Sequence, residues 1–313
     1  MDPQAPPVPW QQVLINQDGV IARWQALAGG LTAHAWDWRL AHGWQSLTPG
    51  VAVAHTGGVS DHQLAWAALL HAGKGAALSG DAALAELGFT TVGARGMWGK
   101  PGFDIAVPAE RRPRDERLTG GRPVVTHRVA NLHLWLPPAA RPPRLNAHAA
   151  VLHACAWAAS DRAAEWRLAA VVQQGISAVP LIRETLAEMP RLPRRRLIRE
   201  VLDDVELGAH AASELQFLRF CRAHDLPLPD DLNLKVRASG TRYLDAYYRR
   251  QKVSFELDGA HHRLAGQWDA DVLRSLQLAV ARRGTGEQLH RLTPTALRHD
   301  GEQVAQLLRA LLL

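Results

Sequence analysis

The sequence predicts a mixed fold, α+β overall, in which the C-terminal part is an α/β sandwich. The chain has 313 residues, of which 47% are hydrophobic, and this is enough for about two domains with buried cores. Helical periodicity dominates the stretches 10–43 and 147–207, whereas short extended runs dominate 103–136. From residue 208 onwards the expected order is helix, three strands, helix, strand and helix, which is the plan of an α/β sandwich.

The composition favours some classes of protein over others. Lys and Arg total 36 against 30 Asp and Glu, and the net charge of +6 favours contact with a polyanion, most commonly nucleic acid. Because Arg far exceeds Lys, part of this charge can instead reflect a GC-rich genome. No apolar run is long enough to cross a bilayer and no secretory signal is apparent, so no membrane partner is expected. The only cysteines, Cys155 and Cys221, lack CxxC spacing, and a reducing cytoplasm fits them better than a disulfide framework or a zinc site.

The N-terminal region is expected to contain a disordered arm and a small helical domain. Residues 1–9 are rich in proline and form the expected arm. Residues 10–57 then predict three short helices, at about 10–16, 20–27 and 33–42, followed by a hairpin around Thr48-Pro49-Gly50. Thr32 is the expected N-cap of the third helix, and Gly43 its expected end.

Three helices and a hairpin are the order of a winged-helix domain, in which the third helix enters the major groove of DNA. In this third helix Trp36 and Leu40 lie four residues apart and can both face the core. The residues left for another face are the candidate DNA contacts, namely His34, Trp38, Arg39 and His42. A small helical domain without a role in DNA binding is the alternative for this segment.

The middle region, 58–207, is expected to be mixed at first and helical later. Helices are predicted within 61–88, with a cap at Ser79 or Asp81, and again as four successive helices within 147–207. Between them lie three short extended runs, FDIAV, PVVTHRV and LHLWLP, and a proline-rich joint. The arginine-rich stretch RLPRRRLIRE is expected to be a solvated helix face, with contact to a phosphate backbone as the alternative.

The stretch YLDAYYRRQKVSFELDGAHHR, residues 243–263, places three carboxylates on two adjacent predicted strands. If RRQK is a four-residue hairpin loop, Tyr248 pairs with Val253, and counting back puts Asp245 directly opposite Glu256. Asp258 then falls opposite Tyr243, on the same face of the hairpin. Opposed side chains have Cβ atoms about 5 Å apart and diagonal ones about 7–8 Å. We therefore expect the three carboxylates to converge.

Carboxylates crowded in this way repel each other, and they must either be protonated or be neutralised by a cation. Mg²⁺ prefers hard oxygen ligands and keeps waters and substrate phosphate in its remaining positions. We therefore expect Asp245, Glu256 and Asp258 to bind Mg²⁺ or Mn²⁺ and to act on a phosphodiester. The alternative is a solvent-facing sheet whose acids are neutralised by Arg and Lys.

The pieces SELQFLRFCRAHDLPLP, RYLDAYYRRQKVSFELDGAHHR, DADVLRSLQLA and LHRLT together resemble the very-short-patch-repair-like branch of the PD-(D/E)XK nucleases. Members commonly have an acidic helix, a strand that carries Asp, and then E-x-D-G followed shortly by His. The resemblance implies that Asp245 is the central metal ligand, that Glu256 or Asp258 is the second, and that Glu214 completes the site. Asp258 stands where the E-x-K motif usually has Lys, so a further metal ligand replaces a positive charge.

The same resemblance gives expected roles to residues after the hairpin. His261 and His262 would act as general base or stabilise the leaving phosphate, with a pair of surface histidines as the alternative. Arg274 and Gln277 fall on the following predicted helix, where polar residues often point into such sites.

The whole chain resembles actinobacterial proteins that join an AbiEi-type antitoxin winged helix to this nuclease-like domain. The resemblance implies a cytoplasmic, nucleoid-associated, Mg²⁺-dependent DNA endonuclease of repair or defence, acting on double-stranded DNA by nicking or cutting, as a homodimer or with a protein partner. The alternative is a DNA-binding transcriptional regulator or antitoxin-like protein whose nuclease-like domain is inactive. The expected domains are 1–9 (arm), 10–57 (winged helix), 58–207 (middle region) and 208–313 (nuclease-like domain).

Overall fold

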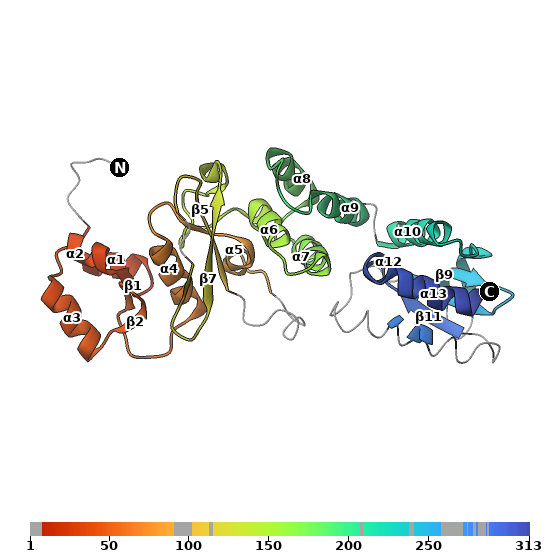
Figure 1. The fold of residues 1–313 in the computed structure, drawn as a ribbon, viewed down its shortest axis with the longest axis horizontal. Helices are drawn as coiled ribbons and strands as arrows, with labels where there is room; N and C mark the ends of the chain where they lie inside the picture. The colour runs from red at the N-terminus through yellow and green to blue at the C-terminus, as the bar shows by residue number, and fades with distance from the viewer. Residues whose placement is uncertain are drawn as a thin grey trace. The chain divides into compact units, whose positions relative to one another are not determined.

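The structure is a computed structural model, and it shows a chain of mixed helices and strands (Figure 1). It describes residues 8–90, 102–112, 115–206, 209–237, 241–257, 272–273, 275–277, 280, 286 and 288–313. These residues divide into two compact units, of which the first ends at Trp157 and the second begins at Ala158. The α+β class expected from the sequence is confirmed.

The first unit opens with three helices and a small antiparallel sheet. The helices are α1 (Trp10–Asn16), α2 (Arg23–Ala28) and α3 (Ala33–His42), and the strands are β1 (Val20–Ala22), β2 (Gln45–Thr48) and β3 (Val51–Val53). The sheet order is β1-β3-β2. As predicted, Thr32 caps α3, since its hydroxyl accepts the N–H of Ala35 at 3.1 Å, and Trp36 is buried in the core of this segment.

One of the three predicted helices is wrong at its start. The predicted helix at 20–27 begins only at Arg23, because Val20–Ala22 is a strand that pairs with Val51–Val53. All three strand residues are buried, and Val20 and Ile21 are β-branched side chains that suit a pleated surface. A three-residue strand is too short to show the alternation that reveals strands in a sequence.

The second part of the first unit contains a four-stranded sheet with helices around it. The helices are α4 (Asp61–Ala72), α5 (Gly80–Glu86) and α6 (Ala147–Ala156), with a 3₁₀ helix η1 (Leu132–Trp135). The strands are β4 (Ala77–Leu78), β5 (Phe103–Pro108), β6 (Glu116–Arg117) and β7 (Pro123–Val129), in the order β4-β5-β7-β6. β5 and β7 are parallel, whereas the two outer pairings are antiparallel.

The predicted extended run LHLWLP is wrong, because η1 occupies most of it. Leu132 and Trp135 are buried while Leu134 is 57% exposed, a spacing of three residues that matches the turn of a 3₁₀ helix. A strand would instead have placed Leu132 and Leu134 on one face.

A buried polar pair ties α5 to α6 in this unit. Ser79, the residue before α5, is fully buried, and its hydroxyl lies 2.7 Å from Nδ1 of His153 on α6. Trp157 stacks on His127 with ring centroids 3.5 Å apart and also contacts His153. Burial, and secondarily the charge of His127, lower the pKa of His153 to about 4, so the buried imidazole is neutral at pH 7.

The second unit begins with three helices, as the sequence predicted: α7 (Asp161–Gln173), α8 (Val179–Glu188) and α9 (Arg195–Glu206). The arginine-rich stretch before and within α9 has two kinds of residue. Arg194 pairs with Asp161 at 2.7 Å, and Arg195 donates to the terminal carbonyls of α8 at Leu186 and Met189, whereas Arg196 and Arg199 are exposed. The first two therefore stabilise the fold, and the exposed pair agrees with the solvated face expected from the sequence.

The C-terminal part contains helices on a four-stranded sheet. The helices are α10 (Ala209–Ala223), α12 (Pro294–His299) and α13 (Gly301–Leu312), and the strands are β8 (Asp231–Arg237), β9 (Thr241–Tyr248), β10 (Val253–Leu257) and β11 (Gln288–Leu292). The sheet order is β11-β10-β9-β8, with β10 and β11 parallel and the other neighbours antiparallel. The helix predicted at 266–283 lies mostly outside the described residues, and those of its residues that are described are helical.

The described core of this sheet gathers residues from α10, α12, α13, β9, β10 and β11. Phe217 of α10 and Tyr248 of β9 both contact Phe255 of β10, with ring centroids 5.8 and 6.0 Å from it. Leu292 of β11 and Leu308 of α13 belong to the same buried cluster. This packing fixes the two strands that carry the candidate site.

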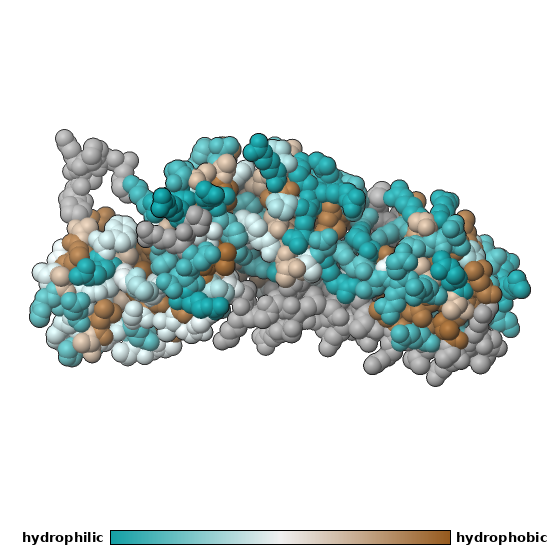
Figure 2. All heavy atoms as spheres, in the orientation of Figure 1, coloured by the Kyte–Doolittle hydropathy of each residue, from teal (hydrophilic) through white to brown (hydrophobic). Residues whose placement is uncertain are grey.

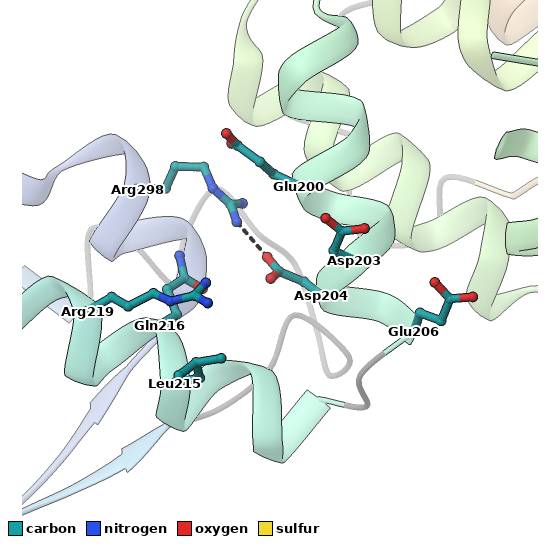
Figure 3. Close-up of a pocket in the computed structure, with 8 residues that line it drawn as sticks. All are labelled: Glu200, Asp203, Asp204, Glu206, Leu215, Gln216, Arg219 and Arg298. Carbon is teal, nitrogen blue, oxygen red and sulfur yellow. Dashed lines mark hydrogen bonds and ion pairs between the residues drawn. The ribbon is translucent and has the colours of Figure 1, made fainter. Parts of the chain in front are cut away.

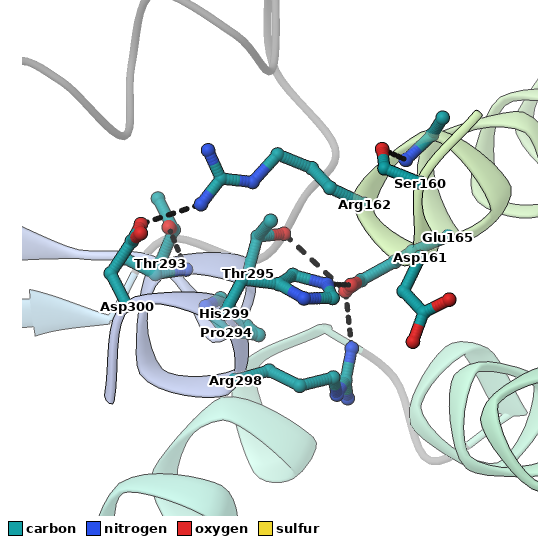
Figure 4. Close-up of polar contacts among 12 residues, drawn as sticks. Ser160, Asp161, Arg162, Glu165, Thr293, Pro294, Thr295, Arg298, His299 and Asp300 are labelled. Atoms are coloured by element: carbon teal, nitrogen blue, oxygen red, sulfur yellow. Dashed lines mark hydrogen bonds and ion pairs between the residues drawn. The ribbon is translucent and has the colours of Figure 1, made fainter. Parts of the chain in front are cut away.

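A polar network joins α7, α9 and α12 within the second unit (Figure 4). Glu165 of α7, 5% exposed, accepts hydrogen bonds from Thr295 at 3.3 Å, from His299 at 2.8 Å and from Arg298. Arg298 also donates to Asp204 of α9 at 2.6 Å. Burial alone raises the pKa of Glu165, but the hydrogen bonds and charges of His299 and Arg298 outweigh it, and the pKa lies below its usual value.

Candidate functional site

The hairpin register predicted from the sequence is confirmed. Val253 pairs with Tyr248, and the pairing runs on to Phe255 and Ala246. Ala246 and Phe255 face the buried core, so Asp245 and Glu256, one step further along each strand, share the opposite face. Two of the three predicted metal ligands therefore lie on one side of the sheet, on neighbouring strands.

Asp245 is held in place by the strand opposite. Asp245 is only 8% exposed, and its Oδ2 accepts a hydrogen bond from the backbone N–H of Leu257 at 2.7 Å. Leu257 is itself buried in the core, so its N–H is a fixed donor. A hydrogen bond to a carboxylate is stronger than one between neutral groups, and this one orients the Asp245 side chain towards the end of β10.

Glu256 has an arginine partner on the next strand. Oε2 of Glu256 accepts from Nε of Arg291 at 2.9 Å, and the parallel register of β10 and β11 places these two residues side by side. The side chains are 26% and 54% exposed, so this ion pair is at the surface. Of the two carboxylates, Asp245 is thus buried and bonded to the backbone. Glu256 is neutralised by Arg291, which lies on a strand that the sequence did not connect with the site.

The remaining predicted site residues are only partly described. Asp258, His261, His262 and Arg274 lie outside the described residues. Glu214, on α10, is half-buried, and Gln277 is exposed. Among the residues that the structure does describe, no three or more His, Cys, Asp or Glu side chains form a group able to hold a metal ion. The three-carboxylate site stays a prediction.

Helix α3 presents an aromatic pair to solvent. Trp38 is 55% exposed and stacks on His42, with ring centroids 4.7 Å apart and an interplanar angle of 17°. Nδ1 of His42 lies 2.7 Å from the carbonyl oxygen of Trp38. Because a carbonyl can only accept, Nδ1 is the donor, and Nε2 of the neutral ring is an acceptor. His34 is exposed on the same helix.

Arg39, the fourth predicted DNA contact on α3, lies in a different setting. Its guanidinium carbon is 4.9 Å from the ring centroid of Trp10 and 5.8 Å from that of Trp44. These cation–π contacts stabilise the packing of α3 on α1 and on the start of the hairpin. A DNA contact by Arg39 stays a prediction, whereas its packing role is visible.

A cavity of about 620 Å³ between α9, α10 and α12 was not anticipated from the sequence (Figure 3). Four acids of α9 line one side, Glu200, Asp203, Asp204 and Glu206. Most of this negative charge is neutralised, because Arg298 pairs with Asp204 and Arg183 pairs with Asp203 and Glu206. The sequence shows these acids spaced along one helix. It does not show the arginines that pair with them, because these are far away in the chain.

The described fold and site define the chain as an α+β protein with a carboxylate-bearing hairpin. No protein-family model matches the chain, and no curated protein matches it significantly. Among the described residues, every helix is too short or too polar to cross a membrane. On the face drawn in Figure 2, apolar patches lie over the α1–α3 segment and over the C-terminal elements, between larger hydrophilic areas.

Proposed function

We propose that this chain is a Mg²⁺-dependent DNA endonuclease whose C-terminal domain is of the PD-(D/E)XK type and whose N-terminal winged helix binds duplex DNA. The observation that carries the proposal is the placement of Asp245, a buried carboxylate fixed by the Leu257 N–H on the face that also carries Glu256. A buried charge is costly unless it is compensated, and such groups concentrate at functional sites.

The order of elements supports the same proposal. A helix, an antiparallel three-stranded meander and a strand parallel to the third of them are all present, in the order expected for this nuclease class. In the N-terminal segment, three helices precede a hairpin, and α3 exposes Trp38, His34 and His42. The net charge of +6 suits a polyanionic substrate.

The residues present fit a hard divalent cation. Asp245 and Glu256 supply carboxylate oxygens, the ligand type that Mg²⁺ prefers, and Asp258 is the predicted third. When bound, the ion would polarise the phosphodiester and favour attack by water, which leaves a 5′-phosphate. The chain's own contribution is to hold Asp245 rigidly through the Leu257 N–H, so that little reorganisation is needed when the substrate arrives.

The replacement Asp245→Asn tests this proposal directly. The amide keeps the size of the side chain but loses the charge, so we expect cleavage of plasmid DNA with Mg²⁺ or Mn²⁺ to fall by at least about a hundredfold, as when one charge-stabilising group is removed from an active site. The measurement is nicking and linearisation of supercoiled plasmid by the full chain, with RNA as a parallel substrate.

Asp231→Asn is the matched control for this test. Asp231 lies on the same face of the sheet, one strand further out and opposite Tyr247, and it is already paired with Arg249 at 2.7 Å, so its replacement should leave cleavage unchanged. Equal cleavage by wild type and Asp245→Asn would contradict the assignment, and so would a wild type that cuts neither DNA nor RNA with either metal.

The replacement Trp38→Ala tests the winged-helix part. If α3 enters the major groove, loss of the exposed Trp38–His42 stack removes contacts to base edges, and duplex affinity should fall about tenfold, within the range of one good base contact. Fluorescence anisotropy with a labelled duplex measures this. Trp24→Ala on α2 removes another exposed tryptophan, 59% exposed, as the control. An equal loss in both variants would mean that α3 has no special role.

A specific observation favours a second candidate function. The Glu256–Arg291 ion pair neutralises one of the carboxylates without a metal ion. In a DNA-binding regulator or antitoxin-like protein that retains the nuclease-like domain as a scaffold, such a pair would be enough to neutralise Glu256. Metal-independent DNA binding without cleavage by any variant would support this function instead.

A further inference from the structure

We propose that Arg291 is an exchangeable counter-ion of the carboxylate site: it holds Glu256 before the cation binds and turns to the DNA phosphate once the cation has taken Glu256. This inference rests on the proposed nuclease function. It assigns a role to a residue on β11 that no motif in the sequence pointed to.

The contact that carries the inference is the bond between Arg291 Nε and Glu256 Oε2, 2.9 Å long. β10 and β11 run parallel with Glu256 beside Arg291, so the pair spans two adjacent strands on the sheet face opposite the core. That face is also the one that carries Asp245. A carboxylate oxygen bound to a guanidinium is a poorer ligand for a divalent ion, so Arg291 and the cation compete for Glu256.

The burial of the three side chains indicates which of them can move. Asp245 is 8% exposed and fixed to a core strand, so it is a permanent ligand. Glu256 and Arg291 are 26% and 54% exposed, and surface ion pairs are weak enough to exchange. A divalent ion can therefore displace Arg291 at small cost, and it leaves a guanidinium at the rim of the site.

A displaced Arg291 has an obvious second partner in the proposed reaction. Guanidinium groups bind phosphate oxygens with two parallel hydrogen bonds, and Arg291 stays within one side chain of the cation site. Arg291 carries its positive charge on β11, the strand beside β10. The motif that begins at Glu256 of β10 has Asp258 at the position that Lys usually holds. Arg291 is thus a positioning residue for Glu256 and a phosphate contact in the substrate complex.

The test measures binding of Mn²⁺ to the full chain by the loss of the free-ion signal in electron paramagnetic resonance. Arg291→Gln should bind Mn²⁺ about threefold more tightly than wild type, the size expected when a surface ion pair that competes for Glu256 is removed. Arg249→Gln is the control, because it removes the same charge from the same sheet, where Arg249 pairs with Asp231. It should change Mn²⁺ affinity little.

A second readout is the affinity of the Mn²⁺-loaded chain for duplex DNA at several salt concentrations. For Arg291→Gln the slope of log affinity against log salt should fall by about 0.9, the change for one lost phosphate contact. Arg291→Lys should keep the slope. A purely structural role of Arg291 would alter neither Mn²⁺ affinity nor the salt slope.

The outcomes separate this inference from the proposed function. If Arg291→Gln and Arg249→Gln bind Mn²⁺ alike, the inference is overturned, while loss of cleavage in Asp245→Asn would still uphold the nuclease. If only Arg291→Gln binds Mn²⁺, and binding depends on Asp245, Arg291 blocks the site instead of exchanging with the cation, and the inference is overturned. If no variant binds Mn²⁺, the inference is overturned together with the metal-dependent function.

Discussion

Replacing Arg298 by Met is expected to lower the free energy of unfolding of the second unit by about 3 kcal/mol, because breaking a buried ion pair leaves an uncompensated charge. Arg298 bridges Glu165 and Asp204, and Glu165 is 5% exposed. His299 and Thr295 still donate to Glu165 in the variant, which keeps the loss near the lower end of the range for such pairs. Thermal melting of the full chain, with hydrogen exchange of α12, measures the effect.

Arg183→Met is the matched control for this prediction. Arg183 also pairs with acids of α9, Asp203 and Glu206, but these acids are 60% and 57% exposed. Surface pairs contribute roughly 0–1 kcal/mol, so this variant should melt close to wild type. Equal destabilisation by the two replacements would show that the Glu165 network does not hold α7, α9 and α12 together.

Lowering the pH from 7 to about 4 is expected to destabilise the first unit through His153. The folded pKa of His153 is about 4, below the usual histidine value of 6.5, because burial disfavours the charged imidazole. Between these values the unfolded chain binds a proton that the folded chain does not, so stability falls as the pH falls. Above pH 6.5 the full stability is present. The loss approaches roughly 3 kcal/mol near pH 4, at about 1.4 kcal/mol per pKa unit.

The replacement His153→Gln removes the titrating group and keeps a side chain that can hydrogen-bond to Ser79. Urea unfolding at pH 7 and at pH 4.5, followed by hydrogen exchange in α5 and α6, should show a smaller acid loss in this variant than in wild type. His34→Gln, an exposed histidine of the same unit, should retain the wild-type pH dependence. If His153→Gln and wild type lose the same stability, the buried imidazole is not the acid-sensitive group.

Much of the fold follows from local sequence. Helices α3 and α6–α10 carry long apolar periodicities, and Thr32 marks the start of α3, so their positions were predictable. The register of the β9–β10 hairpin was also predictable, because the length of the RRQK loop and the alternation of Val253, Phe255 and Leu257 allow one pairing that buries the apolar face. The shared face of Asp245 and Glu256 follows from that register.

The elements that escaped prediction are short or depend on distant partners. β1, β4 and β6 have two or three residues each, and α12 is a six-residue helix, so no period is visible in their sequences. η1 was mistaken for a strand because Leu132 and Leu134 alternate with a polar residue, although it is Trp135 that is buried with Leu132. Only packing against the rest of the unit distinguishes these cases.

The sequence by itself determined that this is a mixed α+β chain with a net positive charge and a hairpin that sets two carboxylates on one face. The tertiary structure decided which counter-charges those and other acids receive: Arg291 beside Glu256, the N–H of Leu257 beside Asp245, and Arg298 beside Glu165. The physical reason is that strand register and helix period are set by neighbours within a few residues. The partner of a buried or half-buried charge depends on which element packs against it. In these cases the partner is 12 to 133 residues away in the chain.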